Sequence, residues 1–180
     1  GLGRILNMRD YAREVARLDR AVEAGRLSRP DVMIVSSPHP LAFASAAKLA
    51  RRWSSRLVFE ERDLWPLSLV ELSGLSPRHP ICLWMQYHVR RAYRTADAVV
   101  TLLPDADRYL VDQGAHSEAI HYIPNGISPA RWDDLQAPLP PDARSLFDEL
   151  RARGKLIVVY AGAHGKPNAL DQILLLAEVP

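Results

Sequence analysis

Short apolar runs alternate along the chain with longer segments in which apolar residues recur at helical spacing. Tyr11, Val15, Leu18 and Val22, for example, predict one stripe of a helix. The runs that have the length of buried strands lie at residues 32–35, 57–61, 98–102, 120–123 and 156–160. Because these runs are largely continuous rather than alternating, they are typical of parallel strands with helices on both faces of the sheet. The pattern therefore predicts an α/β protein built on parallel sheets.

The composition changes between residues 128 and 141, where four prolines stand close to acidic residues. This segment is typical of a linker. We therefore predict a first sheet domain at residues 1–127, a linker with a connecting helix at 128–154, and the start of a second domain at 155–180. The chain begins without Met and stops soon after a helical pattern starts near Asn168. We expect it to be a fragment of a longer protein.

Composition and charge indicate a soluble globular protein and argue against several kinds of partner. Of the 180 residues, 48% are hydrophobic and 24% are charged, and the net charge of +2 does not favour nucleic acid as a partner. Cys82 is the one cysteine, which excludes an internal disulfide and suits a reducing compartment. The six histidines show no metal-ligand spacing, so no metal site is expected. No apolar run reaches the ~18 residues of a membrane span, and no signal peptide is found.

The stretch LVFEERDLWP, residues 57–66, turns from a strand into charged residues at the carboxyl end of that strand. In parallel α/β sheets, ligands bind outside this end of the strands. The Asp63 carboxylate could accept a proton from a substrate hydroxyl or hold a sugar hydroxyl, and the Arg62 guanidinium could bind a phosphate. The alternative is an ion pair that closes the strand end, with Trp65 packing rather than stacking on a ligand.

Other loops that follow predicted strands carry further candidate binding residues. Ser37 and His39 follow the run at 32–35, where the alternative is that Ser37 only caps the next helix and His39 is exposed. Asn125 lies in a Pro-Asn-Gly segment that is a strong turn signal. These positions predict a ligand site at the carboxyl edge of the first sheet.

A glycine-containing loop, Gly162-Ala163-His164-Gly165-Lys166, follows the last predicted strand and precedes a helix. Glycines let the backbone approach a ligand closely, and the free N–H groups at a helix start favour a phosphate. Lys166 could add a positive charge. The spacing fits neither a Walker loop nor the full dinucleotide fingerprint, so a tight turn between strand and helix is the alternative.

Short motifs occur in a fixed order along the chain, and together they carry a family resemblance. They are PDV at 30–32 leading into SSPHP at 36–40, FEERDLWP at 59–66, GLSP at 74–77, AD at 96–97 leading into VTL at 100–102, IPNG at 123–126, and YAGAHG at 160–165. This series resembles glycosyltransferase family 4, and within it the branch that builds bacterial surface polysaccharides such as colanic acid and O-antigen. The resemblance covers nearly the whole chain from about Pro30 onward.

The resemblance implies the GT-B fold, in which two Rossmann-like domains face each other across a cleft. Residues 1–127 would form a nearly complete acceptor-side domain, and residues 155–180 would begin the donor-side domain. Such enzymes transfer a sugar from a nucleotide-sugar with retention of anomeric configuration and without a bound metal, so no cofactor is expected. The acceptor in this branch is often a lipid-linked sugar at the inner face of the membrane. We therefore expect a cytoplasmic protein, with peripheral membrane contact as a further expectation.

Basic residues recur along the first predicted helix, and their purpose is open. One interpretation is a solvated helix face, and the other is a surface that meets anionic lipid headgroups. The residues concerned are Arg9, Arg13, Arg17 and Arg20, with acidic residues between them.

Position by position, the resemblance also implies roles for individual residues. Asp63 matches the acidic residue that lies near the reacting sugar. Many relatives have His before that Asp, where this chain has Arg62, and the branch often has Glu at the position of Leu67. Gly162 and Gly165 match the loop that approaches the donor phosphates. The other candidates for contact with the substrates are Ser37, His39, Trp65, Asn125 and Lys166.

Two other functions stay open beside the transferase. A nucleotide-sugar epimerase shares the two-domain architecture, and a non-catalytic binding module could keep the fold without the chemistry. The paired glutamates with which the family holds the donor nucleotide would lie beyond Pro180. We therefore expect these 180 residues alone to be inactive as a transferase.

Overall fold

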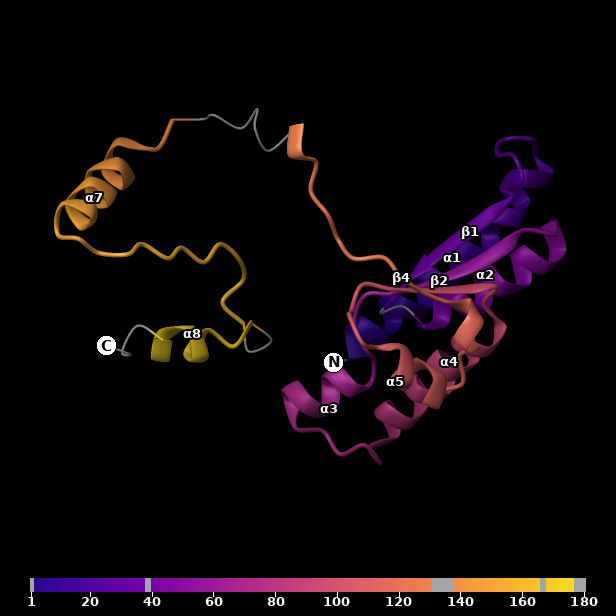
Figure 1. Cartoon of the computed structure of the whole chain (residues 1–180). Coiled ribbons are helices and arrows are strands. Elements are labelled where there is room, and N and C mark those ends of the chain that lie inside the picture. The colour runs from indigo at the N-terminus through magenta and orange to yellow at the C-terminus, as the bar shows by residue number, and fades with distance from the viewer. Residues whose placement is uncertain (1, 38–39, 131–137, 166–167, 177–180) are drawn as a thin grey trace. The chain divides into compact units, whose positions relative to one another are not determined.

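The computed structural model describes residues 2–37, 40–130, 138–165 and 168–176. The chain divides into two compact units, Gly1–Asn125 and Gly126–Pro180. The boundary between the units falls inside the Pro-Asn-Gly turn. Figure 1 shows the elements of each unit. Each unit is described by itself below.

A four-stranded parallel sheet forms the centre of the first unit, which confirms the α/β fold class. The strands pair in the order β1-β2-β3-β4. One row across the sheet pairs Val35, Phe59, Val99 and Ile120 in register. All four strands correspond to predicted apolar runs, and their bounds are Val32–Ser36 for β1, Arg56–Glu61 for β2, Ala98–Thr101 for β3 and Ile120–Tyr122 for β4.

Helices connect the parallel strands, because consecutive parallel strands need a long crossover connection, which is usually a helix. The helices of the first unit are α1 Leu2–Glu23, α2 Pro40–Trp53, α3 Leu67–Ser73, α4 Pro80–Thr95 and α5 Asp107–Asp112. The start of α4 combines Pro80 in the first turn with His79, whose Nδ1 accepts a 3.2 Å hydrogen bond from the Ile81 N–H. None of the helices among the described residues is long and apolar enough to cross a membrane.

The core of the first unit lies between the sheet and helices α2, α4 and α5. Alternate residues of β2, Leu57 and Phe59, are buried and point to this side. Phe59 packs edge-to-face against Phe43 of α2, with ring centroids 5.4 Å apart, and against Tyr93 of α4 at 5.7 Å. Each of these aromatic pairs adds about 0.5–1.5 kcal/mol beyond the area it buries. The aromatic cluster therefore fixes the two central helices against the strand that carries the charged motif.

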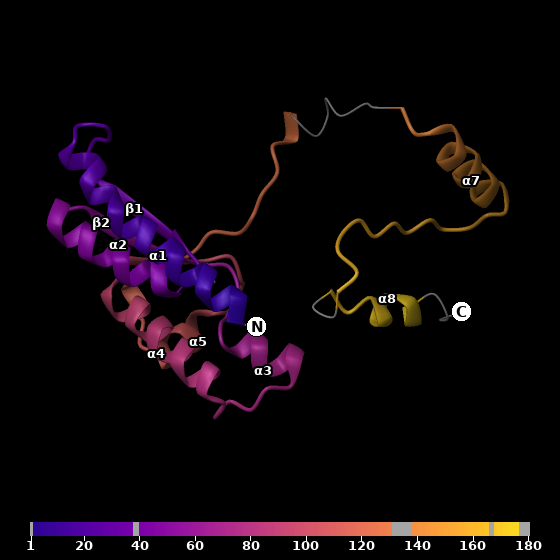
Figure 2. The ribbon, with the colours of Figure 1, turned by 180° about the vertical axis from the view of Figure 1, so that it is seen from behind.

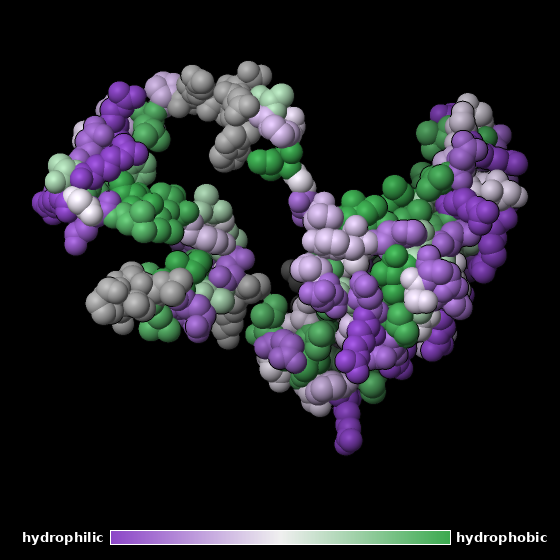
Figure 3. All heavy atoms as spheres, viewed as in Figure 1, coloured by the Kyte–Doolittle hydropathy of each residue, from purple (hydrophilic) through white to green (hydrophobic). Residues whose placement is uncertain are grey.

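The opposite face of the sheet is much less covered, which corrects the expectation of helices on both faces. Figures 1 and 2 show the helices on one side of the sheet. On the other side Ile34 is 68% exposed, and Val58 and Val100 are only half-buried. Figure 3 shows apolar side chains at the surface of this face. The apolar runs predicted the positions of the four strands of this unit correctly, but the described helices of the unit cover only one of the two faces of the sheet.

One helix of the first unit was not expected from the sequence. Helix α3 follows the charged motif directly, begins after the Trp65–Pro66 bond, and ends at Gly74. Gly74 has a φ of +67°, the left-handed conformation in which glycine is favoured over other residues. None of the α3 residues is buried, so it packs loosely on the unit.

The second unit contains helices α7, Pro141–Ala152, and α8, Leu170–Leu176. The prediction of a strand at 156–160 is wrong, since these residues have no regular structure and Leu156 is 91% exposed. A parallel strand is stable only when a neighbouring strand accepts and donates its backbone hydrogen bonds. The described part of this unit contains no strand that could supply these backbone hydrogen bonds. The assignment of residues 155–180 to a second Rossmann-like domain therefore stays a prediction.

Candidate functional site

A pocket of about 400 Å³ lies at the carboxyl ends of the strands of the first unit. Parallel strands bring their carboxyl ends to one edge of the sheet, so residues distant in the sequence meet there. The pocket is lined by Ser37, Arg62, Asp63, Leu102 and Asn125. Four of these were candidate site residues from the sequence, and the structure brings those four together.

Ser37 is the buried residue that holds the pocket wall. It follows β1, and its N–H donates a 2.8 Å hydrogen bond to the Glu60 carbonyl. Its hydroxyl oxygen accepts hydrogen bonds from the Arg62 N–H at 2.9 Å and the Asp63 N–H at 3.3 Å. A serine oxygen has two lone pairs, and both are used here. Ser37 therefore fixes the backbone that follows β2, which is more than the cap considered as its alternative role.

The side chains of Arg62 and Asp63 are exposed at the rim of the pocket. Among the described residues, neither side chain forms an ion pair. The alternative interpretation, an ion pair that closes the end of the strand, is therefore not supported. Arg62 brings a planar cation that can bind a phosphate in two-pronged geometry, and Asp63 brings a carboxylate acceptor. The arrangement can thus hold a ligand that carries both phosphate and hydroxyl groups.

Glu61 is a buried acid next to this pocket that the sequence interpretation missed. Its side chain is 0% exposed, and its Oε2 accepts a 2.6 Å hydrogen bond from the Tyr93 hydroxyl. Burial raises the pKa of Glu61 to about 8, although the hydrogen bond from Tyr93 acts in the opposite direction. The alternation of side chains along β2 could have predicted the burial of Glu61, because every second residue faces the core and Glu61 therefore lies on the same face as Leu57 and Phe59.

The remaining candidates of the first unit lie outside the pocket lining or outside the described residues. Trp65 is half-buried two residues beyond Asp63, and its indole N–H has no hydrogen-bond partner within the described residues. His39 lies outside the described residues, so its predicted role stays a prediction. Among the described residues, no group of three or more His, Cys, Asp or Glu side chains could hold a metal ion.

The described candidates of the second unit, Gly162 and Gly165, lie in the irregular segment before α8. Gly162 and Gly165 flank Ala163, whose carbonyl accepts hydrogen bonds from the Tyr160 hydroxyl at 3.2 Å and from the Asn168 amide at 2.5 Å. A side chain at Gly162 would lie 2.6 Å from the Tyr160 hydroxyl, so glycine suits this position. Lys166 lies outside the described residues. The assignment of this loop to donor phosphates remains a prediction.

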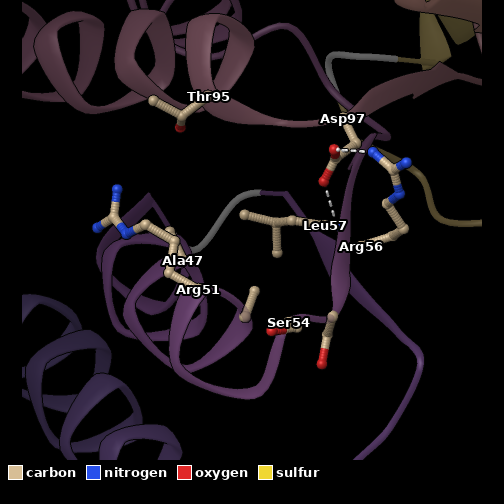
Figure 4. Close-up of a pocket in the computed structure, with 9 residues that line it drawn as sticks. Ala47, Arg51, Ser54, Arg56, Leu57, Thr95 and Asp97 are labelled. Carbon is tan, nitrogen blue, oxygen red and sulfur yellow. Dashed lines mark hydrogen bonds and ion pairs between the residues drawn. The ribbon is translucent and has the colours of Figure 1, made fainter.

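A second and somewhat larger pocket, about 470 Å³, lies at the opposite edge of the sheet. Figure 4 shows Arg56 turned toward Asp97 there, with a nitrogen-to-oxygen distance of 2.8 Å. The other Asp97 oxygen accepts a 2.8 Å hydrogen bond from the Leu57 N–H. These polar groups already satisfy each other and tie β2 to the segment before β3. Because Asp97 and Arg56 are engaged in holding the sheet, we assign the site to the smaller pocket at the carboxyl edge.

Comparison with known proteins establishes the family. The family model for a glycosyl transferase 4-like domain matches residues 2–126, more than half of the chain, and the chain belongs to this family. Among solved structures, the chain is similar to the crystal structure of Anabaena HepE in complex with UDP-glucose, at 17% sequence identity and a TM-score of 0.49. That alignment covers 92% of this chain and 40% of the HepE chain. No curated protein matches the chain.

Proposed function

We propose that this chain is part of a retaining glycosyltransferase that transfers a sugar from a nucleotide-sugar to a glycan acceptor. Family membership supports a transferase, and the convergence of Ser37, Arg62, Asp63 and Asn125 in one pocket is the observation that carries the proposal. We propose further that the acceptor is lipid-linked and that the pathway builds a surface polysaccharide. The resemblance of the ordered motifs to that branch supports this narrower assignment.

The charged residues of the pocket have separate tasks in this proposal. Asp63 accepts a hydrogen bond from an acceptor or donor hydroxyl and orients it at the reacting centre. Arg62 binds a phosphate group of a substrate. Asn125, with both amide donors and a carbonyl acceptor, supplies neutral contacts to sugar hydroxyls, and Ser37 adds its hydroxyl proton as a donor. Neither charged side chain has an ion-pair partner among the residues that the structure describes, which supports these roles because neither must first break an ion pair.

Binding of the donor phosphates is proposed for the second unit. Gly162 and Gly165 let the backbone approach the donor phosphates, and Lys166 adds charge. The chain spans 40% of the HepE chain. We propose that these 180 residues alone do not catalyse transfer, and that transfer needs no metal or cofactor.

A surface on α4 supports the proposal of peripheral contact with the inner face of the membrane. The outward side chains of Leu83 and Tyr87 are 56% and 61% exposed in the first half of this helix. The second half presents the exposed cations Arg91 and Arg94. Exposed apolar and aromatic side chains beside arginines suit an anionic lipid surface.

Helix α1 supports membrane contact less well than α4. Its basic residues Arg13 and Arg17 form ion pairs with Asp10 and Glu14 one helical turn away. Such exposed pairs contribute little to stability, but they neutralise the charge that would attract a lipid headgroup. The solvated-face interpretation is therefore favoured for α1.

Activity of the full-length protein with and without the Asp63 carboxylate tests the proposed function. We expect sugar transfer from a nucleotide-sugar to an acceptor, and a loss of kcat of about 10²–10⁴-fold in Asp63→Asn. Asp31→Asn is the matched control, since Asp31 is an exposed aspartate at the amino edge of the same sheet. Interconversion of the sugar without an acceptor would identify an epimerase. Nucleotide-sugar binding without turnover would identify a binding module, and undiminished transfer by Asp63→Asn would remove Asp63 from the site.

A further inference from the structure

Helices α2 and α4, which pack against each other on the core side of the sheet, carry basic charges and no acidic ones. The basic residues are Lys48, Arg51 and Arg52 in α2, and Arg90, Arg91 and Arg94 in α4. The whole chain, in comparison, has a net charge of only +2. Positive charge is therefore concentrated on this part of the first unit, and such a concentration attracts anions.

Two adjacent arginines at the end of α2 differ in their partners. Arg52 is held by acids of α1, with ion pairs to Asp19 at 2.5 Å and to Glu23 at 2.6 Å. The Arg51 side chain is exposed and forms no ion pair or hydrogen bond within the described residues. The helix dipole favours a cation in the last turn of a helix, and Arg52 already provides one. Arg51 is thus a cation for which the described part of the fold supplies no counter-charge.

Arg51 lines the pocket of about 470 Å³ at the amino edge of the sheet, where α2 and α4 end and β2 begins. Ser54 also lines it, in the turn after α2, and its hydroxyl has no hydrogen-bond partner among the described residues. The Thr95 hydroxyl, in contrast, already donates a 2.7 Å hydrogen bond to the Arg91 carbonyl. Figure 4 shows the lining, with no interaction drawn to the Arg51 guanidinium. Arg51 and Ser54 therefore offer N–H and O–H donors that no described group accepts.

The acid of this lining is already neutralised. Asp97 is the single acidic residue among those that line the pocket. One of its oxygens pairs with Arg56 at 2.8 Å, and the other accepts the Leu57 N–H at 2.8 Å. Figure 4 shows the Arg56–Asp97 pair and the Arg51 guanidinium on opposite sides of Leu57. An anion held at Arg51 would therefore face no unpaired carboxylate of the lining.

We propose that this pocket is a phosphate-binding site, in which Arg51 holds the phosphate group and the Ser54 hydroxyl donates a further hydrogen bond. The planar guanidinium offers two parallel N–H donors to two phosphate oxygens. A pocket of this volume has room for a phosphate group and for part of the molecule that carries it. The site lies at the opposite edge of the sheet from Arg62, so it does not depend on the proposed function. The phosphate belongs either to a soluble compound or to a lipid headgroup, and the tests below distinguish the two.

The first test titrates inorganic phosphate into the full-length protein at pH 7 and follows the backbone amide resonances of Ser54 and Ser55 by NMR. Potassium chloride keeps the ionic strength constant, so that general screening does not enter. The titration is done in an Arg62→Gln background, so that phosphate at the carboxyl edge does not contribute. We expect saturable shifts of both resonances.

Variants of the two adjacent arginines give the matched comparison. Arg51→Gln should weaken phosphate binding about tenfold, because it removes a charge-assisted contact. Arg52→Gln removes the same charge one residue away, and it should change the affinity less than about twofold, because an exposed charge without direct contact is screened. Equal losses in both variants, or shifts that do not saturate, overturn the site.

Ser54→Gly provides a second and independent variant. Ser54 has a φ of +59°, a left-handed conformation that glycine adopts without strain, so this change removes the hydroxyl and keeps the turn. We expect phosphate affinity to fall about threefold, as for the loss of one neutral hydrogen bond. Unchanged affinity in both Ser54→Gly and Arg51→Gln overturns the proposal.

The second test identifies the source of the phosphate by sedimentation with vesicles of phosphatidylcholine that contain about one-third phosphatidylglycerol. If the source is a lipid headgroup, Arg51→Gln lowers the bound fraction more than Arg52→Gln does. If it is a soluble compound, the two variants bind the vesicles equally, while inorganic phosphate still distinguishes them. Both outcomes support the site. A vesicle effect of Arg51→Gln without saturable phosphate binding shows contact with the lipid surface only and overturns the pocket as a phosphate site.

Discussion

The Tyr93 hydroxyl donates a 2.6 Å hydrogen bond to Glu61, and both side chains are buried in the core of the first unit. The pair joins α4 to the end of β2, where the chain leaves the sheet and enters the pocket. It places a polar contact in an otherwise apolar cluster that includes Phe59. An acid in such a place is neutral in the folded protein and ionised in the unfolded chain at neutral pH. The contact therefore makes stability depend on pH.

The first prediction concerns the stability of Glu61→Gln. The pKa of Glu61 rises from 4.5 in the unfolded chain to about 8 in the folded protein, chiefly through burial. The folded state therefore binds more protons between these values, and the wild type loses stability as pH rises from about 4.5 to about 8. Over this window the free energy of unfolding of the wild type should fall relative to Glu61→Gln by on the order of a few kcal/mol.

Urea denaturation at pH 5 and pH 8 measures this difference. Tyr93→Phe serves as a control, because it keeps the acid and so keeps the pH dependence. A difference between the wild type and Glu61→Gln that is the same at both pH values would show that Glu61 does not change its protonation on folding.

A second prediction concerns Ser37→Ala. Removal of the hydroxyl leaves the Arg62 and Asp63 N–H groups without their acceptor, which costs about 1–3 kcal/mol of stability and loosens the pocket wall. Ser55→Ala is the matched control, since the Ser55 hydroxyl donates a 2.5 Å hydrogen bond to the Pro30 carbonyl at the opposite edge of the sheet. Chemical denaturation and ligand affinity should show that both variants lose stability but that only Ser37→Ala loses affinity. An equal effect of both variants on affinity would argue against a local role for Ser37.

Most of the first unit could be predicted from the sequence, because its strands are strongly apolar and its helices are periodic. The run at 156–160 shows where this reasoning fails. Hydrophobicity describes the preference of a segment for burial, whereas a strand also needs a hydrogen-bonding neighbour. Helix α3 is also not predictable from the hydrophobic pattern. None of its seven residues is buried, and seven residues are too few to show a helical periodicity.

The candidate site was predictable in its location and less so in its interactions. Topology alone brings Ser37, Asp63 and Asn125 to one edge, so strand-end residues were correctly expected to meet. The partners of these residues depend on side-chain packing that the sequence does not display. Glu61 was grouped with the exposed charges that follow it, although its position two residues after Phe59 places it on the core face.

A third prediction concerns Asp97, which ties the sheet together away from the pocket. The hydrogen bond from the Leu57 N–H, followed by that from Arg56, lowers the pKa of Asp97 below its usual value. The stabilising effect is therefore present above the unfolded pKa and is lost as pH falls through the folded pKa. We expect Asp97→Asn to be less stable than the wild type by about 1 kcal/mol at pH 7, since it keeps one of the two acceptor oxygens and loses the other together with the charge. Urea denaturation at pH 7 and pH 3 should show this difference shrinking in acid, and a constant difference would exclude a contribution from the charge.

The last prediction separates binding from folding at Arg62. Its side chain is exposed at the pocket and forms no ion pair within the described residues, so Arg62→Gln removes no contact on which the fold depends. Such surface substitutions change stability by less than about 0.5 kcal/mol. Loss of a charge-assisted contact to a substrate phosphate should nevertheless raise KM about tenfold in the full-length enzyme, with kcat little changed, and Arg62→Lys should recover part of the loss. Arg29→Gln, an exposed arginine before β1 at the other edge of the sheet, should alter neither quantity. If Arg62→Gln instead lowers the thermal midpoint and leaves KM unchanged, the arginine stabilises the strand end and does not bind the substrate.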